Sequence, residues 1–112
     1  MFDCSLKNPI GWVPSIHKDT LSWDSNPNTQ TAPADGYFYV AFIAASTQQY
    51  VQASVSDANG NGKYAYTTWT PAAQGGAFIV PVARGDKCKF EAGPNQLQAV
   101  TEFSFIYAQG QK

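Results

Sequence analysis

Residues 31–46 read Thr31-Ala-Pro-Ala-Asp-Gly-Tyr-Phe-Tyr-Val-Ala-Phe-Ile-Ala-Ala-Ser46, a turn followed by a long apolar run. In a β-strand, successive side chains point to opposite faces of the sheet. One face of this strand would carry Tyr37, Tyr39, Ala41 and Ile43, and the other would carry Phe38, Val40, Phe42 and Ala44. Both faces are apolar, so the sequence predicts that both are covered.

Turn residues interrupt apolar or alternating runs about every ten residues, a spacing typical of all-β sandwiches and barrels. The runs predict strands at Thr20–Trp23, Tyr37–Ala44, Gln49–Val55, Lys63–Thr70, Ala77–Val82, Lys87–Ala92 and Leu97–Ala108. Asp24–Thr29 is predicted to be a polar loop, and the proline-containing Ile10–Ile16 an edge strand or extended arm. Together these elements indicate an all-β, antiparallel β-sandwich of about eight strands, a jelly roll or a related fold.

The size and charge of the chain limit its organisation and its partners. Its 112 residues suffice for one domain, which we place at 23–112 behind an arm or edge strand at 1–22. The net charge is -1 and only 13% of the residues are charged, which argues against a basic surface for nucleic acid. No apolar run reaches the roughly 18 residues of a membrane helix, so we expect no membrane insertion. The N-terminus lacks the pattern of a secretory signal, so we expect synthesis without a signal peptide.

The residues that usually carry catalysis or bind metals are sparse and dispersed. Cys4 and Cys88 form no C-x-x-C pair, so we expect two free thiols, with a bridge between them as the alternative. His17, the only histidine, has no ligand cluster at metal-binding spacing, and a local hydrogen bond to Asp19 is expected instead. The acidic residues are scattered, which selects no catalytic pair. We therefore expect a protein that is not an enzyme and has no catalytic residues, metal or cofactor.

Three segments follow one another in a distinctive order. They are Thr31-Ala-Pro-Ala-Asp-Gly-Tyr37, Val80-Pro-Val-Ala-Arg-Gly-Asp86 and Phe103-Ser-Phe-Ile-Tyr-Ala108. In order and spacing they resemble the tip domains of tailed-bacteriophage tail fibres and tail needles. The resemblance covers most of the region from Trp23 to Tyr107.

The resemblance implies a jelly roll related to those of tumour necrosis factor and complement C1q, which forms a homotrimer at the end of a fibre or needle. In such trimers the subunits meet along sheet faces near a threefold axis. The expected subunit contacts are Tyr37, Phe38, Tyr39, Val40, Phe42 and Ile43. Which face of this strand is core stays open at this point. Because neither heptads nor a long β-repeat precedes the domain, we expect an excised tip or a short separate protein.

The aromatic residues outnumber what a core of this size needs. Aromatic faces beside amides and carboxylates suit sugar binding, because the apolar face of a sugar stacks while its hydroxyl groups form hydrogen bonds. The expected ligand contacts are Tyr64, Tyr66, Trp69, Asn59 and Asn61. The alternative is that these rings only fill the core and the subunit interface.

One tripeptide invites a different interpretation. Arg84-Gly85-Asp86 has the sequence of an integrin-binding loop. A Gly-Asp pair between two strands is ordinary turn chemistry, however, and the resembling domains use such a turn structurally. We therefore expect a structural turn rather than a cell-adhesion motif.

These features predict a receptor-binding tip domain that resides in the virion after synthesis in the bacterial cytoplasm. Its expected partners are a fibre or needle shaft and a bacterial surface glycan or outer-membrane protein. The loops Asp57–Gly62, Pro71–Gly76 and Gly93–Asn95 would carry specificity, and three equivalent sites would supply avidity. Two alternatives stay open: a structural trimerisation knob without receptor binding, and a free-standing carbohydrate-binding, lectin-like module.

Overall fold

The structure, a computed structural model, describes residues 17–109. This part of the chain contains eight strands and no helix. The strands are β1 (Lys18–Thr20), β2 (Asn28–Thr31), β3 (Gly36–Ile43), β4 (Gln49–Ser56), β5 (Gly62–Thr70), β6 (Gly75–Val82), β7 (Lys87–Gly93) and β8 (Ala99–Tyr107).

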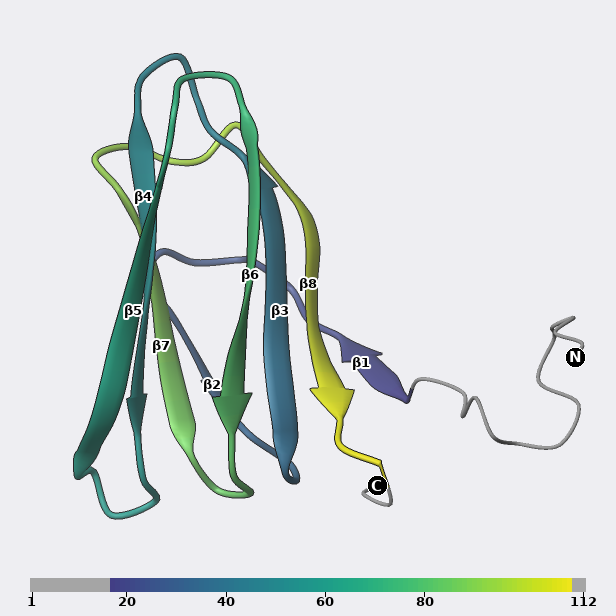
Figure 1. Cartoon of the computed structure of the whole chain (residues 1–112). Coiled ribbons are helices and arrows are strands. Elements are labelled where there is room, and N and C mark those ends of the chain that lie inside the picture. The colour runs from purple at the N-terminus through teal and green to yellow at the C-terminus, as the bar shows by residue number, and fades with distance from the viewer. Residues whose placement is uncertain (1–16, 110–112) are drawn as a thin grey trace, which may run out of the picture.

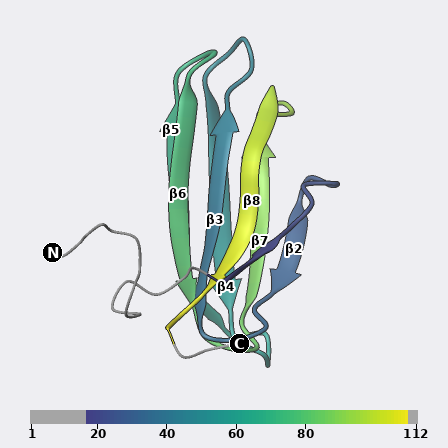
Figure 2. The same ribbon diagram turned by 90° about the vertical axis from the view of Figure 1, so that its right-hand side faces the viewer.

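The strands form two four-stranded antiparallel sheets that pack face to face (Figures 1 and 2). Sheet A has the order β1-β8-β3-β6, and sheet B has the order β2-β7-β4-β5. The inner faces of both sheets supply the core, whose largest fully buried side chains include Phe38, Phe42, Phe90 and Phe105. The predicted all-β sandwich is therefore confirmed.

Strand β3 lies inside sheet A, between β8 and β6. One of its two apolar faces lies in the core and the other lies on the outside of the sandwich. Phe38, Val40 and Phe42 are at most 1% exposed and belong to the core. They are buried by their own chain, so they cannot touch a second copy, and the prediction of a subunit contact is corrected for these three residues. Tyr37 and Ile43 point outward from the sandwich and are only partly buried.

The alternation predicted for Gln49–Val55 is confirmed in β4, where Val51, Ala53 and Val55 are all buried. Strand β6 is an edge strand of sheet A, which suits Pro81 because proline has no backbone N–H to donate to a neighbouring strand.

The sequence prediction failed at the start of the sandwich. Asn28–Thr31, assigned partly to a polar loop, is the edge strand β2 of sheet B. The short strand expected at Thr20–Trp23 lies earlier, at Lys18–Thr20, where it pairs with β8. Leu21 packs against the core, so the globular unit begins before Trp23. The expected strand or arm at Ile10–Ile16 lies outside the described residues.

The antiparallel strands give the sandwich two ends with different contents (Figure 1). One end, here called the terminal end, carries His17, Gln109 and the loops 32–35, 57–61 and 83–86. The opposite end, here called the far end, carries the loops 44–48, 71–74 and 94–98. These three far-end loops contain no charged residue, whereas charged side chains occur in all three loops of the terminal end.

Candidate functional site

The outer face of sheet A is apolar over β3 and β6, whereas its side towards β1 carries the polar residues Lys18, Thr20, Glu102 and Ser104. Neighbouring strands place its members in adjacent rows: Tyr37 and Tyr39 lie beside Pro81 and Ile79. The apolar side chains of this face are Tyr37, Tyr39, Ala41 and Ile43 of β3, Ala77, Ile79 and Pro81 of β6, and Ile106 of β8. Ile79 is 53% exposed, which is unusual for a large aliphatic side chain. We call these eight residues the apolar face.

The outer face of sheet B is mostly polar and provides an internal comparison. Its strand pairings place Thr29 beside Lys89 and Gln52 beside Glu91. The polar side chains of this face are Thr29, Thr31, Gln52, Ser54, Ser56, Thr67, Lys87, Lys89 and Glu91. A sandwich that only needed to stay dissolved would have polar residues on both outer faces. An exposed apolar surface of this kind is uncommon on a monomeric protein.

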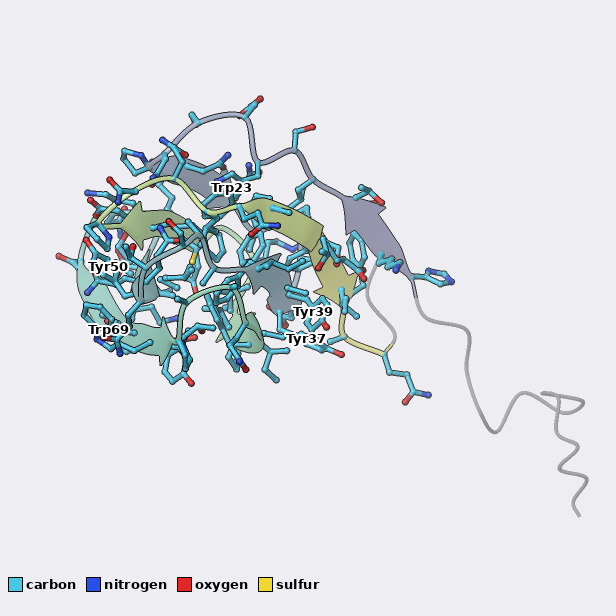
Figure 3. The ribbon with its side chains drawn as sticks, turned by 90° about the horizontal axis from the view of Figure 1, so that it is seen from above. Trp23, Tyr37, Tyr39, Tyr50 and Trp69 are labelled. Atoms are coloured by element: carbon cyan, nitrogen blue, oxygen red, sulfur yellow. The ribbon has the colours of Figure 1, made fainter. Side chains whose placement is uncertain are left out.

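A small aromatic site interrupts the polar face of sheet B near the far end. Tyr50 and Trp69 are cross-strand neighbours with ring centroids 5.1 Å apart. Together with Gln52 and Thr67 they line a shallow cleft of about 210 Å³, here called the Trp69 cleft. Trp69 is 56% exposed, and Figure 3 shows Tyr50 and Trp69 together, away from Tyr37 and Tyr39. An exposed ring beside an amide and a hydroxyl suits the stacking and hydrogen bonding of a sugar.

The glycine opposite Tyr50 makes room for its ring. Gly93 of β7 pairs with Tyr50, and a Cβ at this position would lie 2.6 Å from the tyrosine hydroxyl oxygen. A larger residue at Gly93 would therefore displace the Tyr50 ring from the Trp69 cleft.

Tyr64 and Tyr66 lie on the opposite face of β5 from Trp69. They close the side of the sandwich between β5 and β6, where the Tyr66 ring packs 5.4 Å from that of Phe78. The Tyr64 hydroxyl donates a hydrogen bond to the Pro81 carbonyl. Both rings are still more than 40% exposed, but these contacts hold the two sheets together at an edge. The structure thus separates them from Trp69.

Asn59 and Asn61 lie in the β4–β5 loop at the terminal end. Their backbone N–H groups both donate to one carboxylate oxygen of Asp57, and the Asn61 side chain donates to the other. The Asn59 side chain is exposed. About eight strand residues, roughly 25 Å, separate Asn61 from Trp69. The five predicted ligand residues therefore do not form one site, and Tyr50, Gln52 and Thr67 were missed.

The Arg84-Gly85-Asp86 segment is a structural turn, as predicted. Asp86 is 3% exposed, and its carboxylate accepts hydrogen bonds from Lys63 at 2.8 Å and from the Ala83 N–H at 2.9 Å. The Arg84 guanidinium donates to the Pro33 carbonyl. A buried, paired carboxylate is not available to an integrin.

Two further residues considered in the sequence, Asp19 and Cys88, contact other parts of the sandwich. Asp19 accepts a hydrogen bond from the Tyr107 hydroxyl at 2.6 Å. Cys88 is a free, buried thiol, and burial raises its pKa to about 12. Cys4 lies outside the described residues. Within residues 17–109 no three His, Cys, Asp or Glu side chains gather to hold a metal ion, and no helix is long and apolar enough to cross a membrane.

No protein-family model matches the chain, and a search of the curated proteins finds no match.

Proposed function

We propose that this protein is a non-enzymatic, homotrimeric jelly-roll domain at the tip of a phage tail fibre or tail needle, where it attaches the virion to the bacterial surface. The resemblance of three ordered segments to such tips supports the assignment. The observation that carries it is the apolar face on sheet A, because it supplies the surface that a tip trimer needs.

The strand pairing supports the jelly-roll assignment. The first strand pairs with the eighth, the second with the seventh, the third with the sixth and the fourth with the fifth. This is the pattern of one long hairpin rolled into two sheets, as in a jelly roll of two Greek keys.

The contrast between the two outer faces supports the homotrimer. Large apolar patches are uncommon on monomers, and a copy of the same chain offers a matching apolar surface. Tyr37, Tyr39 and Ile43 are the members of the predicted contact set that remain available on this face. Ile79 and Ile106, from the neighbouring strands, extend it.

The two ends of the sandwich suggest how the domain would be oriented. The first and last described residues, His17 and Gln109, both lie at the terminal end, so we place the shaft at this end. The far end, with the loops 44–48, 71–74 and 94–98, would then face the host. The Trp69 cleft opens near this end, whereas the loop that carries Asn59 and Asn61 lies near the shaft.

The test is attachment of the fluorescently labelled domain to a panel of bacterial strains. We expect saturable binding to the host strain, weakened at least about tenfold by Trp69→Ala, as for a central aromatic contact. Lys89→Ala, on the same outer face outside the cleft, is the matched control and should bind as the unaltered protein does. Attachment to none of the strains would contradict the proposal and favour the structural knob.

A further inference from the structure

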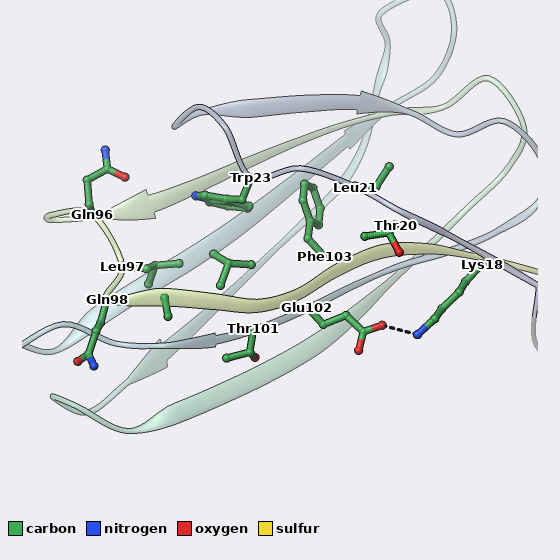
Figure 4. Close-up of a pocket in the computed structure, with 12 residues that line it drawn as sticks. Lys18, Thr20, Leu21, Trp23, Gln96, Leu97, Gln98, Thr101, Glu102 and Phe103 are labelled. Atoms are coloured by element: carbon green, nitrogen blue, oxygen red, sulfur yellow. Dashed lines mark hydrogen bonds and ion pairs between the residues drawn. The ribbon is translucent and has the colours of Figure 1, made fainter.

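A groove lies between the segment that follows β1 and the loop that leads into β8 (Figure 4). Strand β1 pairs with β8 only opposite Ser104–Ile106, and one further backbone hydrogen bond follows, from the Leu21 N–H to the Phe103 carbonyl. The first half of β8 therefore has no strand beside it on this side within the described residues. The space left open is a cavity of about 650 Å³.

The groove has an apolar floor and a polar rim. The floor consists of Leu21, Trp23, Leu97, Val100 and Phe103, with the Trp23 ring packed edge-on against Phe103 at 5.3 Å. The rim carries the primary amides of Gln96 and Gln98 and the hydroxyl of Thr101, all exposed. Each amide offers both a donor and an acceptor.

Hydrogen-bonded amide side chains support both sides of the groove. Gln49 is fully buried, and its amide nitrogen donates to the carbonyls of Asn95 and Gln96 in the β7–β8 loop. On the other side, Asn26 exchanges two hydrogen bonds with the backbone of Ala92. The groove is therefore formed before any ligand arrives, which reduces the entropy lost on binding.

The charges at the groove balance each other. Lys18 and Glu102 form an ion pair at 2.9 Å, and the Glu102 carboxylate also accepts a hydrogen bond from Ser104. The adjacent far-end loops carry no charge at all. Among the residues that line the groove, an anionic or cationic ligand would find no uncompensated charge, whereas an uncharged ligand with many hydroxyl groups would find donors, acceptors and an apolar floor.

A peptide strand is the less suitable occupant, although the edge of β8 is open. The pairing of β3 with β8 shifts register between Ala41 and Phe42, because Ala41 lies opposite Glu102 and Phe42 opposite Val100. Thr101 is thus an extra residue in β8. A bulge of this kind disturbs the regular backbone spacing that an added strand would need.

We propose that this groove binds an uncharged saccharide, with Trp23 and Leu97 against its apolar face and Gln96, Gln98 and Thr101 bonded to its hydroxyl groups. The inference rests on the proposed function, which brings the far end to a bacterial surface glycan. It adds a second contact, on a different side of the sandwich from the Trp69 cleft.

The experiment is a titration of the full-length protein with neutral trisaccharides of glucose, galactose, mannose and N-acetylglucosamine, followed by proton–nitrogen correlation NMR. We expect shifts in the Trp23 indole N–H and in the side-chain amides of Gln96 and Gln98. The double variant Gln96→Ala/Gln98→Ala should weaken binding about tenfold or more, as expected for lost hydrogen bonds. Gln48→Ala/Gln74→Ala, at the same end but outside the groove, is the matched control.

The outcomes separate this inference from the proposed function, because the mass of the same sample is measured in parallel. A trimer whose groove signals respond to no trisaccharide would overturn the inference and leave the tip-domain proposal standing. Shifts confined to Trp69, or groove shifts caused only by a uronic-acid trisaccharide or an uncharged extended peptide, would also overturn it. Groove shifts in a monomeric protein would support the saccharide site and contradict the trimeric tip.

Discussion

Asp86 joins three segments at the terminal end of the sandwich. Its carboxylate accepts hydrogen bonds from Lys63 on β5 and from the Ala83 N–H, and its backbone carbonyl accepts one from the Ala32 N–H. Burial by itself would raise the pKa of the Asp86 carboxyl, but the hydrogen bonds outweigh burial and lower the pKa below its ordinary value. The charged form of this side chain therefore stabilises the fold.

This arrangement predicts a pH dependence of stability. A carboxyl group whose pKa is lower in the folded state contributes stability above its unfolded-state pKa of about 3.9, and this contribution is lost as the pH falls through the folded-state value. Asp86→Asn should lower the free energy of unfolding at neutral pH by about 1–3 kcal/mol, because Lys63 loses its charged partner. The difference from the unaltered protein should shrink below about pH 4.

Denaturant unfolding at several pH values measures both effects. Glu91→Gln, which removes an equal charge from the outer face of sheet B, serves as the control and should change the free energy of unfolding by less than about 0.5 kcal/mol. A loss in Asp86→Asn that stays constant from neutral to acidic pH would contradict the role given to its charge.

At the scale of the strands, the sequence predicted the elements whose side chains alternate or are continuously apolar. β3 and β4 are of this kind, and the burial of their side chains alternates along each strand. β2 was missed because side-chain hydrogen bonds hold Asn28 and Gln30 in place. Neither the strand propensity of these residues nor the hydrophobic periodicity of the sequence reveals such bonds. Polar residues of this type are usually found in loops.

Only the part of the candidate site that lies on a single strand could be predicted from the sequence. The exposure of Trp69 was anticipated, but its separation from Tyr64 and Tyr66 follows from strand parity, which places them on opposite faces of β5. Its partner Tyr50 comes from β4, so the Trp69 cleft depends on the pairing of two strands. The groove depends on where β1 ends relative to β8, and no local pattern in the sequence encodes that register.

Strand β3 also provides a prediction about close packing. A Cβ on Gly36 would lie 2.2 Å from the Ile106 carbonyl oxygen and 2.8 Å from the Phe105 ring. Because the nearest obstacle is backbone, β8 itself would have to move. Gly36→Ala should therefore lower the free energy of unfolding by about 2–3 kcal/mol.

Gly62 provides the matched control, since a Cβ there would meet nothing within 4 Å. Gly62→Ala should change the free energy of unfolding by less than about 0.5 kcal/mol in the same denaturant titration. Equal effects of the two substitutions would show that the contact between Gly36 and β8 is not as close as described.

At the scale of the whole molecule, the sandwich is asymmetric in two directions. The outer face of sheet A is apolar over β3 and β6, whereas the outer face of sheet B is mostly polar. The far-end loops are uncharged, whereas the terminal-end loops are charged. The first asymmetry follows from a strand that is apolar on both sides: Phe38 and Val40 fill the core, and Tyr37 and Tyr39 lie on the outer face, where we propose a subunit contact. The second is consistent with the proposed orientation, in which the uncharged loops face the host.

The apolar face predicts that a single charge will separate the subunits. Ile79 is 53% exposed in one copy of the chain, so Ile79→Lys should be accepted by the isolated sandwich. In a trimer the lysine would be buried without a partner, which is strongly unfavourable. We expect the variant to be folded and monomeric, with a circular dichroism spectrum like that of the unaltered protein. Lys89→Ala, on the polar face, should leave the mass unchanged.

The most direct test of the central claim is the solution mass of the unaltered protein, measured by light scattering on a sizing column. We predict three times the mass of the chain over a wide range of concentration, and one chain mass for Ile79→Lys. A monomer at high concentration would contradict the account, because the apolar face would then have no copy of the chain to cover it.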